Sequence, residues 1–200
     1  MMNTESPCDL ESVIATVRLD QRASRSPDTK GETDALLGML REVSEKPAIF
    51  FDKLVEEALA ITQADSSGIS LLHEREGRFV WPAVVGGLAS YIGQGTPADF
   101  GPCGTVLDRD APVLFIHPER HFTYLDSISP PLEEVLLIPF HMDHKPVGTI
   151  WAVIHEKDRH FDAEDKRLLE NLSSFAASAY RVLVSNGALD ALLGIKPAQS

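Results

Sequence analysis

Cys103 is the first residue in this sequence whose type and position could do chemistry. It lies in Phe100-Gly101-Pro102-Cys103-Gly104-Thr105, where residues 104–109 predict a short helix. A thiol at a helix N-terminus can have a lowered pKa and serve as a redox group or attach a cofactor. Free cysteine is also among the most buried residue types, so a purely structural role in packing the loop onto a sheet is the alternative.

A second group consists of aromatic and polar side chains that recur along the predicted strands and the long loop between them. An enclosed apolar cavity with a few polar groups is the usual form of a small-molecule site, which makes this group a candidate pocket. Each of these side chains could instead fill the core. The candidate ligand-binding residues are Trp81, Tyr91, Phe100, Cys103, Phe115, His121, Phe122, Tyr124 and Trp151.

Three histidine pairs raise the question of a metal site. No cysteine or acidic residue obviously converges on them, and Pro118 interrupts the helical spacing of one pair. We therefore expect structural or surface histidines and no metal site. The pairs are His117 with His121, His141 with His144, and His155 with His160.

The elements that must position these side chains centre on a hairpin and a helix near the C-terminus. Residues 135–140 and 147–154 predict two strands joined by a turn, and the second strand is mostly apolar on both faces. Such a strand belongs in the middle of a sheet with a layer on each side. Asp162 and Asp165 predict a capping box that starts a helix running to Ser185, with a wide apolar face.

These segments resemble the last strand and last helix of bacterial GAF domains, which are cytoplasmic sensory modules often placed ahead of histidine kinases. The resemblance extends over roughly residues 47–185. It implies an α+β, PAS-related fold with a central antiparallel sheet of five or six strands. The N- and C-terminal helices would pack on one face, and loops and short helices would cover a pocket on the other. The residues that carry it are 148–151, 155–156, 159–169, 112–115, 101–104 and 67–72.

The chain divides into four parts by composition. We expect a flexible N-terminal arm and linker (1–31), an amphipathic helix (32–46), the GAF domain (47–185) and a C-terminal tail (186–200). The helix over 32–46 would present Leu36, Leu37, Leu40 and Val43 on one side, and the arm has one helical stripe at Leu10, Val13, Ile14 and Val17.

The first part of the domain predicts a second helix over 47–64 and strands over 68–73, 79–85 and 112–116. Pro82 cannot donate a ladder hydrogen bond, which places its strand at a sheet edge.

The charge and composition of the chain limit the classes of partner that it can bind. The formal net charge of −12 weighs against nucleic acid, because phosphate binding needs clustered Lys and Arg. No apolar run is long enough to span a bilayer, and two cysteines are too few for a disulfide framework. We therefore expect a soluble, cytoplasmic protein without nucleic-acid or membrane partners.

Sensing is the function that the resemblance implies. A small molecule of unknown identity would bind in the pocket and change the packing of the helices across a homodimer, with a histidine kinase or another signalling protein as partner. No output segment follows Ser185, so the output is expected in a partner or in residues outside this chain. The alternatives are a ligand-free dimerisation scaffold, or a haem- or bilin-bound redox or light sensor.

Two features bear on cofactor and enzyme alternatives. Bilin-binding relatives often attach their chromophore through a Cys followed by His, whereas Gly104 follows Cys103 here. Free methionine sulfoxide reductases use several cysteines in one pocket, and the other cysteine of this chain, Cys8, lies far away in the arm. We therefore expect that the chain is not an enzyme, and the cofactor stays unknown.

Overall fold

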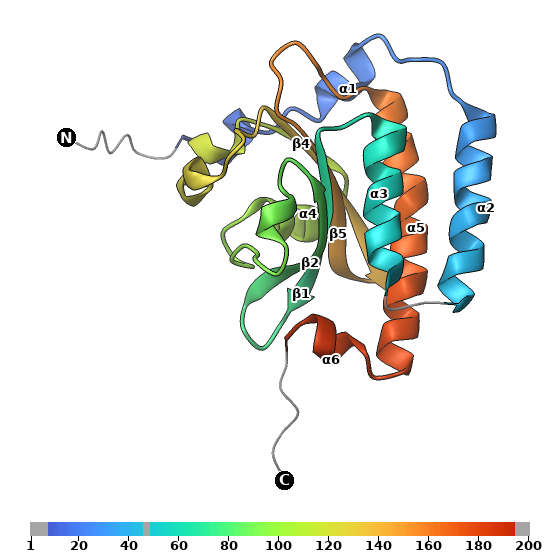
Figure 1. The fold of residues 1–200 in the computed structure, drawn as a ribbon. Coiled ribbons are helices and arrows are strands. Elements are labelled where there is room, and N and C mark those ends of the chain that lie inside the picture. Colours follow the sequence, from blue (N-terminus) through green and yellow to red (C-terminus); the bar gives the residue numbers. More distant parts are fainter. Residues whose placement is uncertain (1–7, 46–48, 195–200) are drawn as a thin grey trace.

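The structure, a computed structural model, describes residues 8–45 and 49–194, without the side chains of residues 40–45. Five strands form one sheet in the order β2-β1-β5-β4-β3, and every neighbouring pair is antiparallel. Helices cover both faces (Figure 1), which confirms the predicted α+β fold. The strands are β1 (Ser66–His73), β2 (Arg78–Gly86), β3 (Val113–Ile116), β4 (Glu134–Met142) and β5 (Lys145–Ile154).

Strand β5 lies at the centre of the sheet, between β1 and β4, as its two apolar faces predict. Ile150 and Ala152 point into one buried cluster, whereas Trp151 and Val153 point into another on the opposite face. Pro82 lies in β2, which is an edge strand, so the missing N–H leaves the ladder intact.

Two antiparallel helices, α3 (Phe50–Thr62) and α5 (Ala163–Ser185), cover one face of the sheet (Figure 1). The capping box at the start of α5 is present: Asp162 accepts hydrogen bonds from the backbone N–H groups of Glu164 and Asp165, and Asp165 accepts one from the N–H of Asp162. This arrangement satisfies donors that a helix start leaves free.

Helix α2 (Thr29–Glu45) lies outside α3 and α5 as a further layer (Figure 1). It begins at Thr29 rather than Glu32, because the Asp28 carboxylate accepts a hydrogen bond from the N–H of Gly31 and caps the first turn. Met39 is buried and Leu37 is half exposed. The predicted apolar side chains of Leu40 and Val43, and residues 46–48, lie outside the described residues.

The N-terminal segment is not the flexible arm that its polar composition predicts. From residue 8 onward it follows the free edge of β3, where Ile14 forms an antiparallel bridge with Phe115. The N–H of Ala15 donates to the carbonyl of Leu114 at 2.8 Å, and that of Ile116 donates to the carbonyl of Val13 at 2.8 Å. The segment supplies the partners that an edge strand would otherwise lack.

The expected helical stripe in this segment is also wrong. The segment contains a short turn, η1 (Leu10–Ser12), the extended bridge, and helix α1 (Val17–Gln21). Val13 and Leu19 are buried, whereas Val17 is 64% exposed, so the apolar residues do not share one helical face.

Arg22, at the end of α1, fixes this segment to the sheet through a buried ion pair. Its guanidinium donates to both carboxylate oxygens of Glu134, at 2.9 and 2.6 Å, and to the carbonyl of Phe161 at 2.6 Å. The Glu134 side chain is only 2% exposed and also accepts from the N–H of Phe161. A carboxylate this deeply buried needs its cation.

We predict that Arg22→Ala lowers the free energy of unfolding by about 3 kcal/mol, because it leaves the Glu134 charge buried without its main partner. Urea unfolding followed by circular dichroism measures the change. Arg18→Ala is the matched control, since Arg18 lies exposed on the same helix and its loss should change stability by less than about 0.5 kcal/mol. Equal effects of the two changes would contradict the role of the buried pair.

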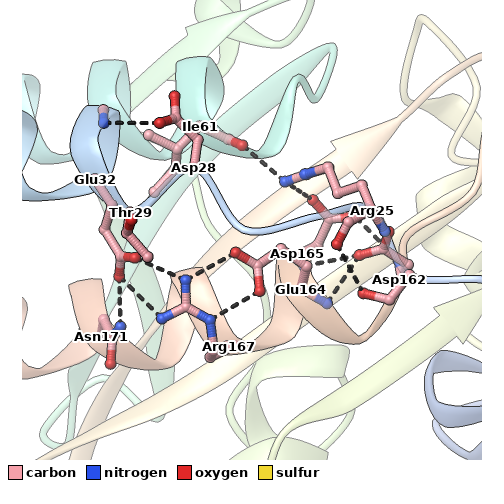
Figure 2. Close-up of polar contacts among 12 residues, drawn as sticks. Arg25, Asp28, Thr29, Glu32, Ile61, Asp162, Glu164, Asp165, Arg167 and Asn171 are labelled. Atoms are coloured by element: carbon pink, nitrogen blue, oxygen red, sulfur yellow. Dashed lines mark hydrogen bonds and ion pairs between the residues drawn. The ribbon is translucent and has the colours of Figure 1, made fainter.

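A second polar network joins the linker and α2 to the start of α5 (Figure 2). Arg167 binds Glu164 on its own helix and Glu32 on α2, with its Nη2 at 2.8 and 2.7 Å from their carboxylate oxygens. Arg25 pairs with Asp165 at 2.6 Å and donates to the carbonyl of Ile61 at 2.8 Å. The linker thus contacts both α3 and α5.

The Asp165 carboxyl makes this network sensitive to pH. Its burial raises its pKa to about 6, although the N–H of Asp162 and the nearby Arg25 both favour the charged form. A carboxyl whose pKa is higher in the folded state binds its proton more tightly there. Its contribution to the free energy of unfolding is therefore fully present below pH 4 and is lost as the pH rises to about 6.

We predict that Asp165→Asn removes about 3 kcal/mol of pH dependence between pH 4 and 7. The amide oxygen of Asn can still accept from the N–H of Asp162, so the cap itself remains. Urea unfolding of both proteins at pH 4, 5, 6 and 7 measures the difference between them, which cancels the other titrating groups. A constant difference across this range would show that Asp165 titrates normally.

The C-terminal segment is ordered as far as it is described. Residues 186–194, predicted as a tail, include helix α6 (Leu189–Leu192), and Leu193 is buried against the helix-side core; residues 195–200 lie outside the described residues. None of the helices in the described ranges is both long enough and apolar enough to cross a bilayer.

Candidate functional site

The face of the sheet opposite α3 and α5 is closed by a cover made of η3 (Ala89–Tyr91), α4 (Pro102–Arg109), η4 (Pro118–Arg120), η5 (Thr123–Ser127) and their loops. A cavity of about 40 Å³ lies between the sheet and this cover. One water molecule needs about 10–15 Å³ by the same measure, so the closed cavity has room for a few waters. The sheet contributes Trp81, Val135, Leu137, Trp151 and Val153 to its wall.

The two tryptophans of the chain meet in this wall. Their rings pack edge to face with centroids 5.6 Å apart. Trp151 lies over Gly68, its cross-strand neighbour on β1, and its Nε1 donates to the Ser70 hydroxyl at 2.9 Å. A Cβ on Gly68 would lie 2.2 Å from the Trp151 ring, so only glycine leaves room for the ring in this position.

We predict that Gly68→Ala displaces the Trp151 ring and lowers the free energy of unfolding by about 1–3 kcal/mol, the usual cost of overpacking. Near-ultraviolet circular dichroism reports the ring displacement, and urea unfolding reports the cost. Gly38→Ala is the matched control, because a Cβ at that helical position meets nothing within 4 Å and alanine favours a helix. Wild-type values in Gly68→Ala would contradict the close approach.

Cys103 enters the cavity from the first turn of α4 and belongs to a buried polar chain. Its thiol donates to the Ser70 hydroxyl at 3.2 Å, and the Thr149 hydroxyl lies 3.6 Å from its sulfur. Burial raises the pKa of the Cys103 thiol despite these contacts and its place in the helix. The thiol is therefore neutral at physiological pH and acts as a hydrogen-bonding member of the wall.

The structure divides the nine predicted site residues into three groups. Trp81, Cys103 and Trp151 line the cavity. Tyr91 and Tyr124, with Trp81, line an adjacent hollow of about 140 Å³. The remaining four form a ring cluster between β3 and the cover that does not line either hollow. Phe115, on β3, and Phe122 are buried, Phe100 is 41% exposed, and the His121 ring contacts both Phe100 and Phe122.

Sequence reasoning missed the aliphatic part of the wall. Val135 and Leu137 alternate along β4, and Val153 follows Trp151 by two residues on β5, so all three share the face of Trp151. The alternation of side chains along these strands is visible in the sequence, and it would have placed the three residues in the wall. Thr96 was missed as well, because it lies in an irregular loop without any periodic pattern.

The histidines have local partners. His121 Nδ1 lies 2.6 Å from the carbonyl oxygen of Cys8, and His155 bonds to the Ser66 hydroxyl and the Pro131 carbonyl. Within residues 8–45 and 49–194, no three His, Cys, Asp or Glu side chains are grouped so that they could hold a metal ion.

A family model described as the GAF domain matches residues 44–180, well over half of the chain. The chain belongs to the GAF domain family. Comparison with curated proteins finds no match. The predicted resemblance over residues 47–185 is thus confirmed as a family relationship, while the bacterial sensory context stays a prediction.

Solved structures show the same GAF fold. The GAF domain from a phosphoenolpyruvate-protein phosphotransferase of Coxiella burnetii has a TM-score of 0.68 at 18% identity, covering 81% of this chain and 99% of that chain. The second GAF domain of DevS from Mycobacterium smegmatis has a TM-score of 0.58 at 22% identity, covering 72% and 99%. At these identities the likeness establishes the fold.

A third structure corrects the expectation that this chain is not an enzyme. Free methionine-R-sulfoxide reductase from Neisseria meningitidis, solved with its substrate, has a TM-score of 0.62 at 15% identity, covering 82% of this chain and 97% of that chain. Reductases from Thermoplasma acidophilum and Staphylococcus aureus also match. The GAF fold therefore includes enzymes, and the small number of cysteines in this sequence was not a sufficient reason to exclude catalysis.

Proposed function

We propose that this chain is a signal-sensing GAF protein that binds a small molecule in the cavity between Trp81, Cys103 and Trp151. The observation that carries the proposal is the mostly apolar hollow between the sheet and the cover. Two aromatic rings and a few polar groups in an otherwise apolar wall are the usual composition of a ligand site.

Binding requires the cover to move. Sites for drug-sized ligands measure about 300–1,000 Å³, far more than the closed cavity. The cover consists of short helices and loops, whereas the opposite face carries the long helices α3 and α5. Such short elements are the part of a domain that opens at the lowest cost in free energy.

Strand β5 provides the route for the signal. It carries Trp151 and Val153 into the cavity and Ile150 and Ala152 into the core beneath α3 and α5. A ligand that displaces the Trp151 ring shifts the same strand on which these helices pack, and packed cores respond by discrete shifts. We propose that α3 and α5 pass the change across a homodimer to a signalling partner such as a histidine kinase.

We predict that a metabolite bound in this cavity raises the melting temperature of the wild-type protein by about 5 °C or more at saturation. Leu132→Phe should abolish the response, because Leu132 lines the cavity and the larger ring fills it. Leu37→Phe makes the same chemical change at a half-exposed position on α2 and should keep the full response. Thermal-shift screening of a metabolite library against the three proteins measures this.

Native mass spectrometry of the purified protein, with an absorption spectrum, completes the experiment. A retained small molecule identifies the ligand, and visible absorption would reveal haem or a bilin. Absence of any response in the screen, together with a ligand-free native mass, would overturn the proposal and favour a dimerisation scaffold.

A further inference from the structure

Three buried polar groups beside the cavity have no hydrogen-bond partner among the described residues: Trp81 Nε1, Thr96 Oγ1 and Tyr124 OH. Trp81 is 7% exposed and Thr96 is 4% exposed. Native proteins leave few buried polar groups unsatisfied, because each one costs about 1–3 kcal/mol. The Thr96 hydroxyl lies close enough to the Tyr124 hydroxyl and the Cys103 thiol to lower the pKa of both groups, but it makes no hydrogen bond of normal geometry with either.

These three groups gather where the cavity meets the adjacent hollow. Trp81, Thr96, Leu125 and Ile128 line both spaces, and Tyr124 lines the adjacent hollow. We call the adjacent hollow, bounded by these residues and Tyr91, the vestibule. The unsatisfied groups therefore mark the junction between the apolar cavity and a more polar hollow beside it.

The chemistry of the three groups defines what would satisfy them. An indole N–H can only donate, so Trp81 requires an acceptor, while the two hydroxyls can donate to the same atom or accept. Trp151 offers an internal contrast, since its N–H already donates to Ser70 at 2.9 Å. Of the two indole groups in the wall, the one belonging to Trp81 has no acceptor among the described residues.

The residues that line the cavity and the vestibule also determine which ligand charge is favourable. No Asp, Glu, Lys, Arg or His is among the described residues that line the cavity and the vestibule. Burial raises the pKa of both Cys103 and Tyr124, so both groups are neutral. A charged ligand would lose its hydration without meeting an opposite charge, which is strongly unfavourable.

We propose that the pocket selects an uncharged, largely apolar small molecule with a carbonyl-type acceptor that binds Trp81 Nε1 at the junction of the cavity and the vestibule. The proposal rests on the proposed function, because it names the class of ligand for the same cavity. The apolar part of such a molecule would occupy the cavity beside the two tryptophans once the cover opens.

A matched trio of probes tests this class: indane, 1-indanone and indane-1-carboxylate, which share one apolar skeleton. The chain contains two tryptophans, so a ¹⁵N-labelled sample gives two indole N–H signals, and Trp81→Phe assigns them. Titration of each probe into the full chain yields affinities from these signals. The Trp151 signal reports occupancy of the cavity by any of the three probes, since Trp151 lines the cavity and its N–H is already bonded to Ser70.

We predict that 1-indanone binds about tenfold more tightly than indane and shifts the Trp81 indole proton downfield, as one net hydrogen bond would produce. The carboxylate should bind more weakly than either. In Trp81→Phe, which keeps an aromatic ring, the advantage of the ketone should disappear while the affinity for indane is retained.

Other outcomes overturn the inference in distinguishable ways. Equal affinities of indane and 1-indanone for the wild type would mean that a bound water satisfies Trp81, and tighter binding of the carboxylate would refute an uncharged ligand; both leave the proposed function standing. If none of the three binds but native mass spectrometry finds another retained molecule, the ligand class is wrong. If neither experiment finds a ligand, the proposed function fails as well.

Discussion

The double-sided burial of strand β5 is the constraint on which the rest of this structure depends. Its side chains are apolar in both directions, so each face of the sheet must be kept from water by a separate layer. The two layers differ in kind. One is a pair of helices, α3 and α5, with apolar faces toward the sheet, and the other is assembled from short turns and loops around α4 (Figure 1).

The difference between the two layers explains why the apolar cavity lies beneath the cover. Long helices pack against a twisted sheet with few voids, because their ridges of side chains adjust along their whole length. Short elements pack only locally. On that side the polar groups near Ser70 bond to one another, while Trp81 Nε1 has no partner among the described residues. This contrast separates the structural part of the wall from the part that we propose a ligand contacts.

Local signals in the sequence were sufficient for much of the fold. The hairpin of β4 and β5, the edge position of β2 and the capping box of α5 follow from alternation, a proline and two aspartates that act within a few residues. The placement of the N-terminal segment could not be predicted this way, because Arg22 and Glu134 are 112 positions apart. A polar segment with a distant ionic partner has the same composition as a disordered one.

The site was predictable only in part, because residue type alone does not show which side chains border a cavity. Aromatic residues are conspicuous in a sequence, but ring size does not reveal whether a side chain borders a cavity or fills the core, and Phe115 and Phe122 do the latter. The aliphatic residues that complete the wall were accessible through the alternation of β4. The polar junction at Thr96 depends on loop geometry, which no periodic pattern encodes.

Because the N-terminal segment packs along β3, the folded unit is longer than the segment that matches the family model. The family match begins at residue 44, yet the chain before it closes one side of the sheet and neutralises Glu134. A fragment trimmed to the family boundaries would present an open row of backbone donors and acceptors, together with a buried Glu134 carboxylate that has lost Arg22. Open rows of this kind join other copies edge to edge, so self-association of such a fragment would reflect the trimming rather than the native protein.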